Sequence, residues 1–458
     1  MNPQLEHFQV SPTVLPAGEP VTVTITGCGD YYRFFDDVTY TVQLCPKELH
    51  DTEIDEDFTL GGYDYRTVPG TCQNGVLSFT YTFIGEQEWE VLVFSDEKQA
   101  EHDNIVRKAY GVSWGLPATM SKWGLNFRVY SLLPDLYKTR VYAGDLHVHS
   151  DASDGQEAPE IVCANYRALG NDFMALTDHH YYPSSLRAKK SMEPLSTGFT
   201  VFPGEEVHNK YLGRFHIVHF NGQSSVNEII LSNREAVKEE VKALSRKLEG
   251  LSPRDAEEVA WYQWVTEKIR ERGGLSILAH PFWSCRHCYN CPTHITTEVI
   301  RRGYYDILEI LGGCTPGDNN LQTAFYQELR AEGQSIPIAG STDCHSTAMR
   351  GKNDCDIAKT LVFATAPEEI PQAIMNLFSV AVEQLPGESP HIYGPFRLVK
   401  YARFLLENYF PQHNRLCQAS GTLLREYFLG NPDLKPAIEA AEQQITLYAN
   451  RFFHKNNK

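Results

Sequence analysis

Hydrophobic and polar residues alternate along much of the first 140 positions of the chain. Gly, Pro, Asp and Asn separate the alternating runs, which cover residues 20–26, 38–42, 76–83, 89–94 and 125–130. Successive side chains of a strand point to opposite faces, so such runs are typical of half-buried β-strands. We therefore predict an all-β, sandwich-like domain over residues 1–140.

The pattern changes after residue 141, where wholly apolar runs alternate with segments of helical periodicity. Helices are expected at 159–169, 233–248, 255–271 and 323–332. The apolar runs are a first strand near 144–149 and later ones at 173–177, 200–202, 215–218, 275–279, 307–311 and 336–340. Repeated β/α units build parallel sheets, so we predict a closed or nearly closed α/β barrel over residues 141–390.

Residues 391–458 have a mainly helical pattern. We expect a C-terminal helical segment there, which either covers the barrel or contacts another subunit. In the second case the protein would be a homo-oligomer. No candidate chemistry lies in this segment.

Composition narrows the classes of function. A chain of 458 residues with 42% hydrophobic residues exceeds one core, so two or three domains are expected. A net charge of −17 argues against extended nucleic acid as a partner. The first residues lack a signal-peptide pattern, and no run of about 18 apolar residues occurs. Eleven cysteines make a disulfide framework improbable, and we expect a cytoplasmic protein without a membrane partner.

Candidate metal chemistry begins at His147 and His149, which alternate in the first apolar run. In a strand they share one face, roughly 7 Å apart. Asp154 follows in a Ser/Asp/Gly turn that can bring its carboxylate back toward them. Imidazole and carboxylate together suit zinc, manganese or iron better than calcium.

Later strands end in the same residue types. Asp178, His179 and His180 follow one run, Glu205, Glu206 and His208 another, and further candidates are His216, His219, His280, Asp343 and His345. The carboxyl ends of strands in a parallel barrel meet at one face, where active sites form. The residues therefore predict one polynuclear metal site.

These motifs resemble those of the polymerase-and-histidinol-phosphatase (PHP) family of metallohydrolases, and within it the carbaryl-hydrolase-like subgroup. The resemblance covers about residues 141–365. It implies a distorted (β/α)7 barrel that holds two to three divalent ions, zinc, manganese or iron, through His147, His149, Asp154, His179, Glu206, His216, His280, Asp343 and His345. Glu206 would be the bridging carboxylate, with Glu205 pointing the other way. Family spacing favours His216 over His219, which would lie on opposite strand faces, and Cys344 is interpreted as a packing residue.

The ligand set implies a metal-dependent phosphoesterase that cleaves a small phosphate ester with activated water. We assign catalytic roles to Asp178, His179 and Asp343, with Asp178 orienting the His179 ring or taking a proton. Candidate substrate-binding residues are Arg286, Arg350, His180 and His208. Two alternatives remain: hydrolysis of a non-phosphate ester or carbamate, and an inactive barrel that serves as a binding module.

A second cluster follows the Ala-His-Pro motif. Cys285, Cys288 and Cys291 are spaced at intervals of three, with His294 nearby. They could hold a structural zinc or part of an iron–sulfur cluster. The four residues are packed more tightly than in a usual zinc finger, so we favour a loop of reduced cysteines.

Overall fold

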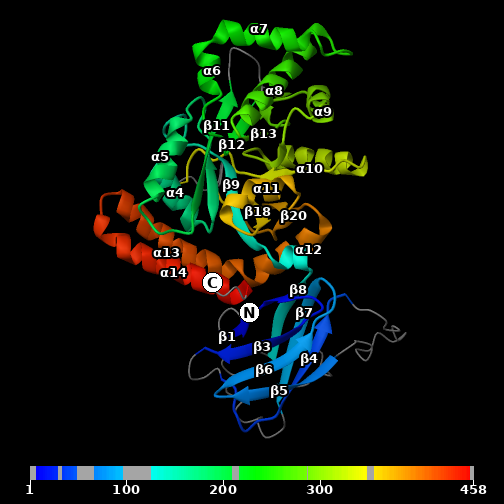
Figure 1. The fold of residues 1–458 in the computed structure, drawn as a ribbon, viewed down its shortest axis with the longest axis vertical. Coiled ribbons are helices and arrows are strands. Elements are labelled where there is room, and N and C mark those ends of the chain that lie inside the picture. Colours follow the sequence, from blue (N-terminus) through cyan, green and yellow to red (C-terminus); the bar gives the residue numbers. More distant parts are fainter. Residues whose placement is uncertain are drawn as a thin grey trace. The chain divides into compact units, whose positions relative to one another are not determined.

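The computed structural model describes residues 7–28, 33–48, 66–95, 125–208, 216–285, 287–347 and 355–453 (Figure 1). Their contacts group the chain into two units. The first comprises Met1–Thr139, Lys400–His413 and Ile445–Lys458, and the second comprises Arg140–Val399 and Asn414–Gln444. The C-terminal segment thus contributes residues to both units, and the domain boundaries given above stay a prediction.

The N-terminal part of the first unit is an eight-stranded sheet in the order β1-β3-β6-β5-β4-β7-β8-β2 (Figure 1). Its strands are β1 (Phe8–Ser11), β2 (Val14–Pro16), β3 (Pro20–Gly27), β4 (Tyr40–Pro46), β5 (Arg66–Gln73), β6 (Val76–Thr82), β7 (Gln87–Ser95) and β8 (Leu125–Leu132). Val23 and Phe79 from one end of this order share an apolar core with Val91 and Phe127 from the other. The sheet therefore folds over onto itself.

Each alternating run of the sequence overlaps one of these strands, although β4 begins two residues later than its run and β6 ends one residue earlier. Strand β5 was not predicted from the sequence, because its residues are mostly polar and show no clear apolar alternation. In the structure none of its eight side chains is fully buried. It pairs with β4 through Arg66–Gly70 and with β6 through Thr71–Gln73, so it joins the two halves of the sheet.

The second unit is built on a ten-stranded mixed sheet in the order β17-β16-β13-β12-β11-β10-β9-β18-β19-β20. Its strands are β9 (Arg140–Val148), β10 (Phe173–Leu176), β11 (Thr200–His208), β12 (His216–Phe220), β13 (Leu275–Leu278), β16 (Ile307–Leu311), β17 (Ile338–Gly340), β18 (Ala358–Ala364), β19 (Ser379–Glu383) and β20 (His391–Tyr393). The seven apolar runs after residue 141 correspond to β9, β10, β11, β12, β13, β16 and β17.

The expectation of an all-parallel barrel is wrong at β12, which runs antiparallel to both β11 and β13. Only seven residues separate β11 from β12, whereas a parallel crossover needs a dozen or more. Strands β18, β19 and β20 extend the sheet in antiparallel fashion beyond β9.

The sheet curls so that β17 returns to β9. Val148, the last residue of β9, forms a parallel bridge with Cys344, which follows β17, and the His149 amide donates to the Cys344 carbonyl at 2.9 Å. This closure places the residues that follow β9 beside those that follow β17. Cys344 is buried in an apolar cluster with Val148, as a packing residue would be.

Helices surround this sheet (Figure 1). They are α4 (Pro159–Ala168), α5 (Pro183–Met192), α6 (Asn227–Ser232), α7 (Arg234–Ser245), α8 (Pro253–Glu271), α9 (Thr293–Arg301), α10 (Pro316–Ala331) and α11 (Ile370–Met375). Helix α10 begins seven residues before the expected start, because Thr315 caps it by accepting from the Asp318 amide. The C-terminal helices are α12 (Phe396–Asn408), α13 (Phe410–Phe428) and α14 (Lys435–Phe453). In the part of the chain that the structure describes, no helix is both long and apolar enough to cross a membrane.

Candidate metal centre

The site is built first from the end of β9. His147 lies in the strand and His149 directly after it, and both rings are buried. The chain then turns through residues 151–154 and carries Asp154 toward the rings. Asp178, which follows β10, fixes this turn by accepting hydrogen bonds from the Ser150 amide and from the Ser150 and Ser153 hydroxyls, each at 2.7 Å.

Glu206 lies at the centre of the cluster. Its Oε2 is 3.2 Å from His147 Nε2, 3.4 Å from His149 Nε2 and 3.0 Å from His179 Nδ1. Its Oε1 is 2.6 Å from His216 Nδ1 and 3.7 Å from His280 Nε2. One carboxylate on β11 is therefore shared by histidines from the neighbouring strands on both sides.

Asp343, beyond the end of β17, faces the same histidines from the other side. Its Oδ1 is 2.9 Å from His149 Nε2 and 3.2 Å from His147 Nε2, and its Oδ2 is 3.8 Å from His280 Nε2. Both strand ends that the curled sheet brings together thus supply candidate ligands to one cluster.

A third group lies toward the solvent. Asp154 Oδ1 is 3.3 Å from His345 Nε2 and 3.8 Å from His149 Nδ1, and its Oδ2 is 3.7 Å from His179 Nε2. The structure therefore brings all nine expected ligand residues into a few groups that share members. Within each group the potential ligand atoms lie within 4.8 Å of one another.

The donor atoms fit divalent cations. His147 Nε2, His179 Nδ1 and Glu206 Oε2 are buried and have no hydrogen-bond partner, although Glu206 Oε2 lies 3.2 Å and 3.0 Å from the two ring nitrogens. Buried polar atoms that face one point without bonding to each other are the arrangement that a cation at that point would satisfy. Imidazole and carboxylate donors in this proportion are typical of zinc, manganese or iron sites.

Charge pairing dominates the electrostatics. Burial would lower the pKa of His147, but Asp343, Glu206 and Glu309 raise it well above its ordinary value. Burial is likewise outweighed at His149, where Asp343 and Glu206 raise the pKa to about 9. Burial alone would raise the pKa of Glu206, yet His216, His179 and His147 hold it well below its usual range. Binding of a cation would therefore displace protons from these rings.

Two of the expected ligand residues have strained backbones. His280 has a φ of +26° and Asp343 a φ of +49°. This left-handed backbone conformation costs a non-glycine residue free energy. It persists where the surrounding structure holds it in place, which is often at functional sites. The strain is consistent with a site in which the direction of the His280 and Asp343 side chains matters more than the local stability of the backbone.

Glu309 is part of the cluster, although sequence reasoning assigned it no role. It lies in the middle of β16 and forms a candidate ligand group with His147 and His280. The signal was present in the sequence, because Glu309 is the single charged residue of the run 307–311, which is otherwise apolar.

The alternative histidine on β12 faces the other way. His219 Nδ1 is 3.3 Å from Glu205 Oε1, and Glu205 also accepts from the Ser225 hydroxyl and the Asn227 side-chain amide. The structure therefore puts His216 with Glu206 on the cluster face and His219 with Glu205 on the opposite face.

The remaining residues with a predicted role were assigned to catalysis or substrate binding, and only some of them lie at the cluster. Asp178 holds the 150–153 turn through Ser150 and Ser153, and this is a different task from the expected orientation of His179. His180 and His208 stack at 5.5 Å, and the His208 ring is 5.3 Å from that of His179, so both lie at the cluster. Arg286 and Arg350 lie outside the described residues.

The cysteine motif forms a short hairpin. Strands β14 (Ser284–Cys285) and β15 (Cys288–Tyr289) pair, while Cys291 is buried and His294 is 3.4 Å from Asp255. Among the described residues, no three potential ligand atoms of Cys285, Cys288, Cys291 and His294 lie within 4.8 Å of one another. These described residues do not assemble the structural zinc site that was the less favoured alternative, because Cys291 packs into the apolar core while Cys285 and Cys288 lie in the hairpin.

We therefore predict that the double substitution Cys285→Ser and Cys288→Ser leaves both metal content and stability unchanged. Neither thiol is buried, and exposed substitutions typically change the free energy of unfolding by about 0.5 kcal/mol or less. Elemental analysis and thermal melting of the variant beside wild type measure both quantities. A loss of about one metal ion per chain would restore the structural zinc site.

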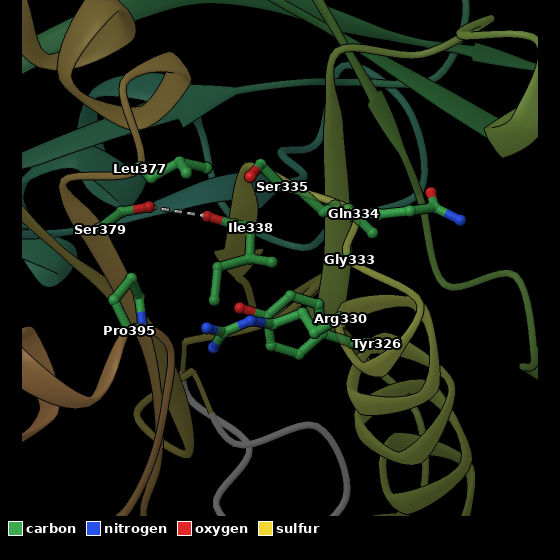
Figure 2. Close-up of a pocket in the computed structure, with 10 residues that line it drawn as sticks. Tyr326, Arg330, Gly333, Gln334, Ser335, Ile338, Leu377, Ser379 and Pro395 are labelled. Carbon is green, nitrogen blue, oxygen red and sulfur yellow. Dashed lines mark hydrogen bonds between the residues drawn. The ribbon is translucent and has the colours of Figure 1, made fainter.

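A pocket of about 220 Å³ lies away from the cluster. Figure 2 shows the Arg330 side chain beside the Tyr326 ring, with the Ser379 hydroxyl bonded to the Ile338 carbonyl. Ile338 begins β17 and Asp343 follows its end, so pocket and cluster lie at opposite ends of this strand. The described residues that line the pocket include no histidine and no carboxylate, and we assign no chemistry to it.

Comparison with known proteins gives structural likenesses only. No protein-family model and no curated protein sequence matches the chain. A solved two-domain protein from Bacteroides vulgatus, described as containing a predicted PHP-like metal-dependent phosphoesterase, is 18% identical with a TM-score of 0.37, over 55% of this chain and 67% of that chain.

Two further solved structures are similar. A protein from Bifidobacterium adolescentis described as a metal-dependent phosphoesterase is 17% identical with a TM-score of 0.34, over 46% of this chain and 92% of that one. An amidohydrolase from Chromobacterium violaceum is 19% identical with a TM-score of 0.31, over 46% and 89%. Because these TM-scores are below 0.5, we base the function on the side chains of the cluster.

Proposed function

We propose that this protein is a metal-dependent hydrolase of the PHP type that cleaves a small phosphate ester. The observation that carries the proposal is the shared carboxylate of Glu206, whose two oxygens face different histidine groups, together with the unpartnered buried donors around it. A binding module without activity would have no need for three overlapping groups of ligands.

Different groups of these residues would hold different ions. His147, His149, Glu206 and Asp343 would hold one ion, Glu206, His216 and His280 a second, and Asp154, His179 and His345 a third. When bound, such ions activate water and stabilise the negative charge that develops on a substrate oxygen. Asp178 keeps Asp154 in place through Ser150 and Ser153, and Glu206 fixes the spacing between the first two groups.

His180 and His208 are proposed to bind the substrate. Burial, and then the neighbouring His216, lowers the pKa of His208 to about 3, and burial also lowers that of His180. Both rings are therefore mainly neutral at pH 7, and a neutral imidazole has one N–H that can donate to a substrate oxygen and one nitrogen that can accept from a substrate hydroxyl. The net charge of −17 would repel a long polyanion, and this favours a compact phosphate ester.

A non-phosphate ester or carbamate is the second candidate, in line with the resemblance to the carbaryl-hydrolase-like subgroup. One feature favours it: the Trp283 ring lies 5.6 Å from that of His280 and 6.0 Å from that of His216, so an aromatic surface adjoins the ligands. A neutral aromatic ester could stack there.

An assay panel decides between the candidates. Protein loaded with zinc, manganese or iron(II) is tested on phosphomonoesters, phosphodiesters, carboxyl esters and carbamates, with Glu206→Gln as the control for contaminating activity. We expect the highest kcat/KM for a phosphomonoester. Faster hydrolysis of neutral esters would favour the second candidate, and equal rates for wild type and Glu206→Gln would contradict both.

A further inference from the structure

Glu309 is a carboxylate buried in an apolar strand. Its exposed fraction is 0%, and its four neighbours in β16 are Ile307, Leu308, Ile310 and Leu311. A charge in such a position is costly unless it is paired and hydrogen-bonded. The partners of Glu309 therefore show why this position carries a carboxylate.

Both oxygens of Glu309 contact expected metal-ligand residues. Oε1 is 3.1 Å from His147 Nδ1, and Oε2 accepts a hydrogen bond of 2.8 Å from the His280 backbone amide. The other ring nitrogen of His147, Nε2, faces Glu206 and Asp343. Glu309 thus links a ligand on β9 to one that follows β13, from the side away from Glu206.

The chain leaves room for this carboxylate. A Cβ atom at Gly312 would lie 2.9 Å from Glu309 Oε2 and 3.1 Å from His280 Cβ. Any larger residue at position 312 would press on the contact between Glu309 and His280.

We propose that Glu309 is a positioning residue for the metal centre, an inference that rests on the proposed function. By accepting from His147 Nδ1–H, it fixes the tautomer in which Nε2 carries the lone pair for a cation, and its negative charge makes that nitrogen a stronger donor. By accepting from the His280 amide, it holds the strained backbone at φ +26° that aims the His280 ring. Both of its oxygens are used in these contacts, so Glu309 acts through His147 and His280 and is not itself a ligand.

Glu205 provides a matched control. It is equally buried, lies on β11 beside Glu206, and contacts a histidine ring, His219, at 3.3 Å. That histidine faces away from the cluster. Glu309→Gln and Glu205→Gln therefore remove the same charge from equally buried positions, but only the first touches the ligands.

The test measures zinc binding to metal-free wild type, Glu309→Gln and Glu205→Gln by competition with a chromophoric chelator. Loss of an outer partner of a ligand typically weakens metal binding about 10–100-fold, so we expect that loss in Glu309→Gln with unchanged stoichiometry. Glu205→Gln should bind like wild type. Glu309→Asp, which keeps the charge on a shorter side chain, should fall between wild type and Glu309→Gln and serves if the latter does not fold.

The outcomes separate the two proposals. Equal zinc affinity of Glu309→Gln, or of Glu309→Asp in its place, and Glu205→Gln would overturn the positioning role while leaving the proposed function intact. Loss of one zinc ion from the stoichiometry would also overturn it, because Glu309 would then be a ligand. Absence of zinc binding by wild type would instead contradict the proposed function itself.

Discussion

The Glu206→Gln variant is expected to lose nearly all metal binding and hydrolase activity. The substitution keeps the volume of the side chain but replaces one of two oxygens that face His147, His149, His179 and His216. Loss of an outer-shell partner alone costs about 10–100-fold in metal affinity or activity, and loss of a shared ligand should cost more. Metal content by elemental analysis and kcat/KM on the best substrate measure the effect.

The N-terminal sheet should stay folded in this variant, because the contacts of Glu206 lie in the second unit and the apolar core of that sheet does not include them. Circular dichroism and limited proteolysis would report on the fold. A folded Glu206→Gln protein with full metal content would contradict the central place of this carboxylate.

The Glu442→Ala variant is expected to be strongly destabilised. Glu442 on α14 accepts from Arg167 Nε at 2.9 Å and from its Nη2 at 2.7 Å, and also from the Ser420 hydroxyl and the Gly198 amide. Arg167 on α4 is fully buried and would keep Asp172, 3.1 Å away, as its ionic partner while its Nε and Nη2 lost theirs. Removal of one partner of a buried ion pair costs about 3–5 kcal/mol, and we expect a loss toward the lower end of that range. Thermal or urea unfolding of the purified variant measures the loss.

Glu439→Ala is the matched control on the same helix. Its carboxylate lies 4.0 Å from Lys435 with 41% of the side chain exposed, and exposed pairs contribute about 0–1 kcal/mol. A melting temperature of Glu442→Ala no lower than that of Glu439→Ala would show that the Arg167 pair does not hold α14 to α4.

Much of the second unit could be predicted from the sequence because its signals are local. Apolar runs such as 173–177 and 307–311 are strands for simple reasons of burial, and the glycines after helices, such as Gly170, mark their ends. The histidines and acids at these strand ends could be expected to meet, since closure of a curled sheet brings Val148 beside Cys344.

The remaining features depend on contacts between distant segments. The direction of β12 follows from the short connection after His208, and periodicity does not report it. Asp178 accepts hydrogen bonds from Ser150 and Ser153, and these contacts depend on the turn after β9 lying beside the end of β10. Sequence patterns do not report such a contact. The role of Glu309 was missed because its run was interpreted as a core strand, although a buried charge in such a strand requires a partner.

The most direct test is an anomalous difference map from crystals of the protein loaded with zinc, recorded at the zinc edge. We predict about two to three peaks, two at the ligand groups that share Glu206 and a third, where present, at the adjoining group of Asp154, His179 and His345. Peaks only at the cysteine hairpin of Cys285 and Cys288, or no peak near Glu206 in fully loaded crystals, would contradict the metal centre and the function proposed from it.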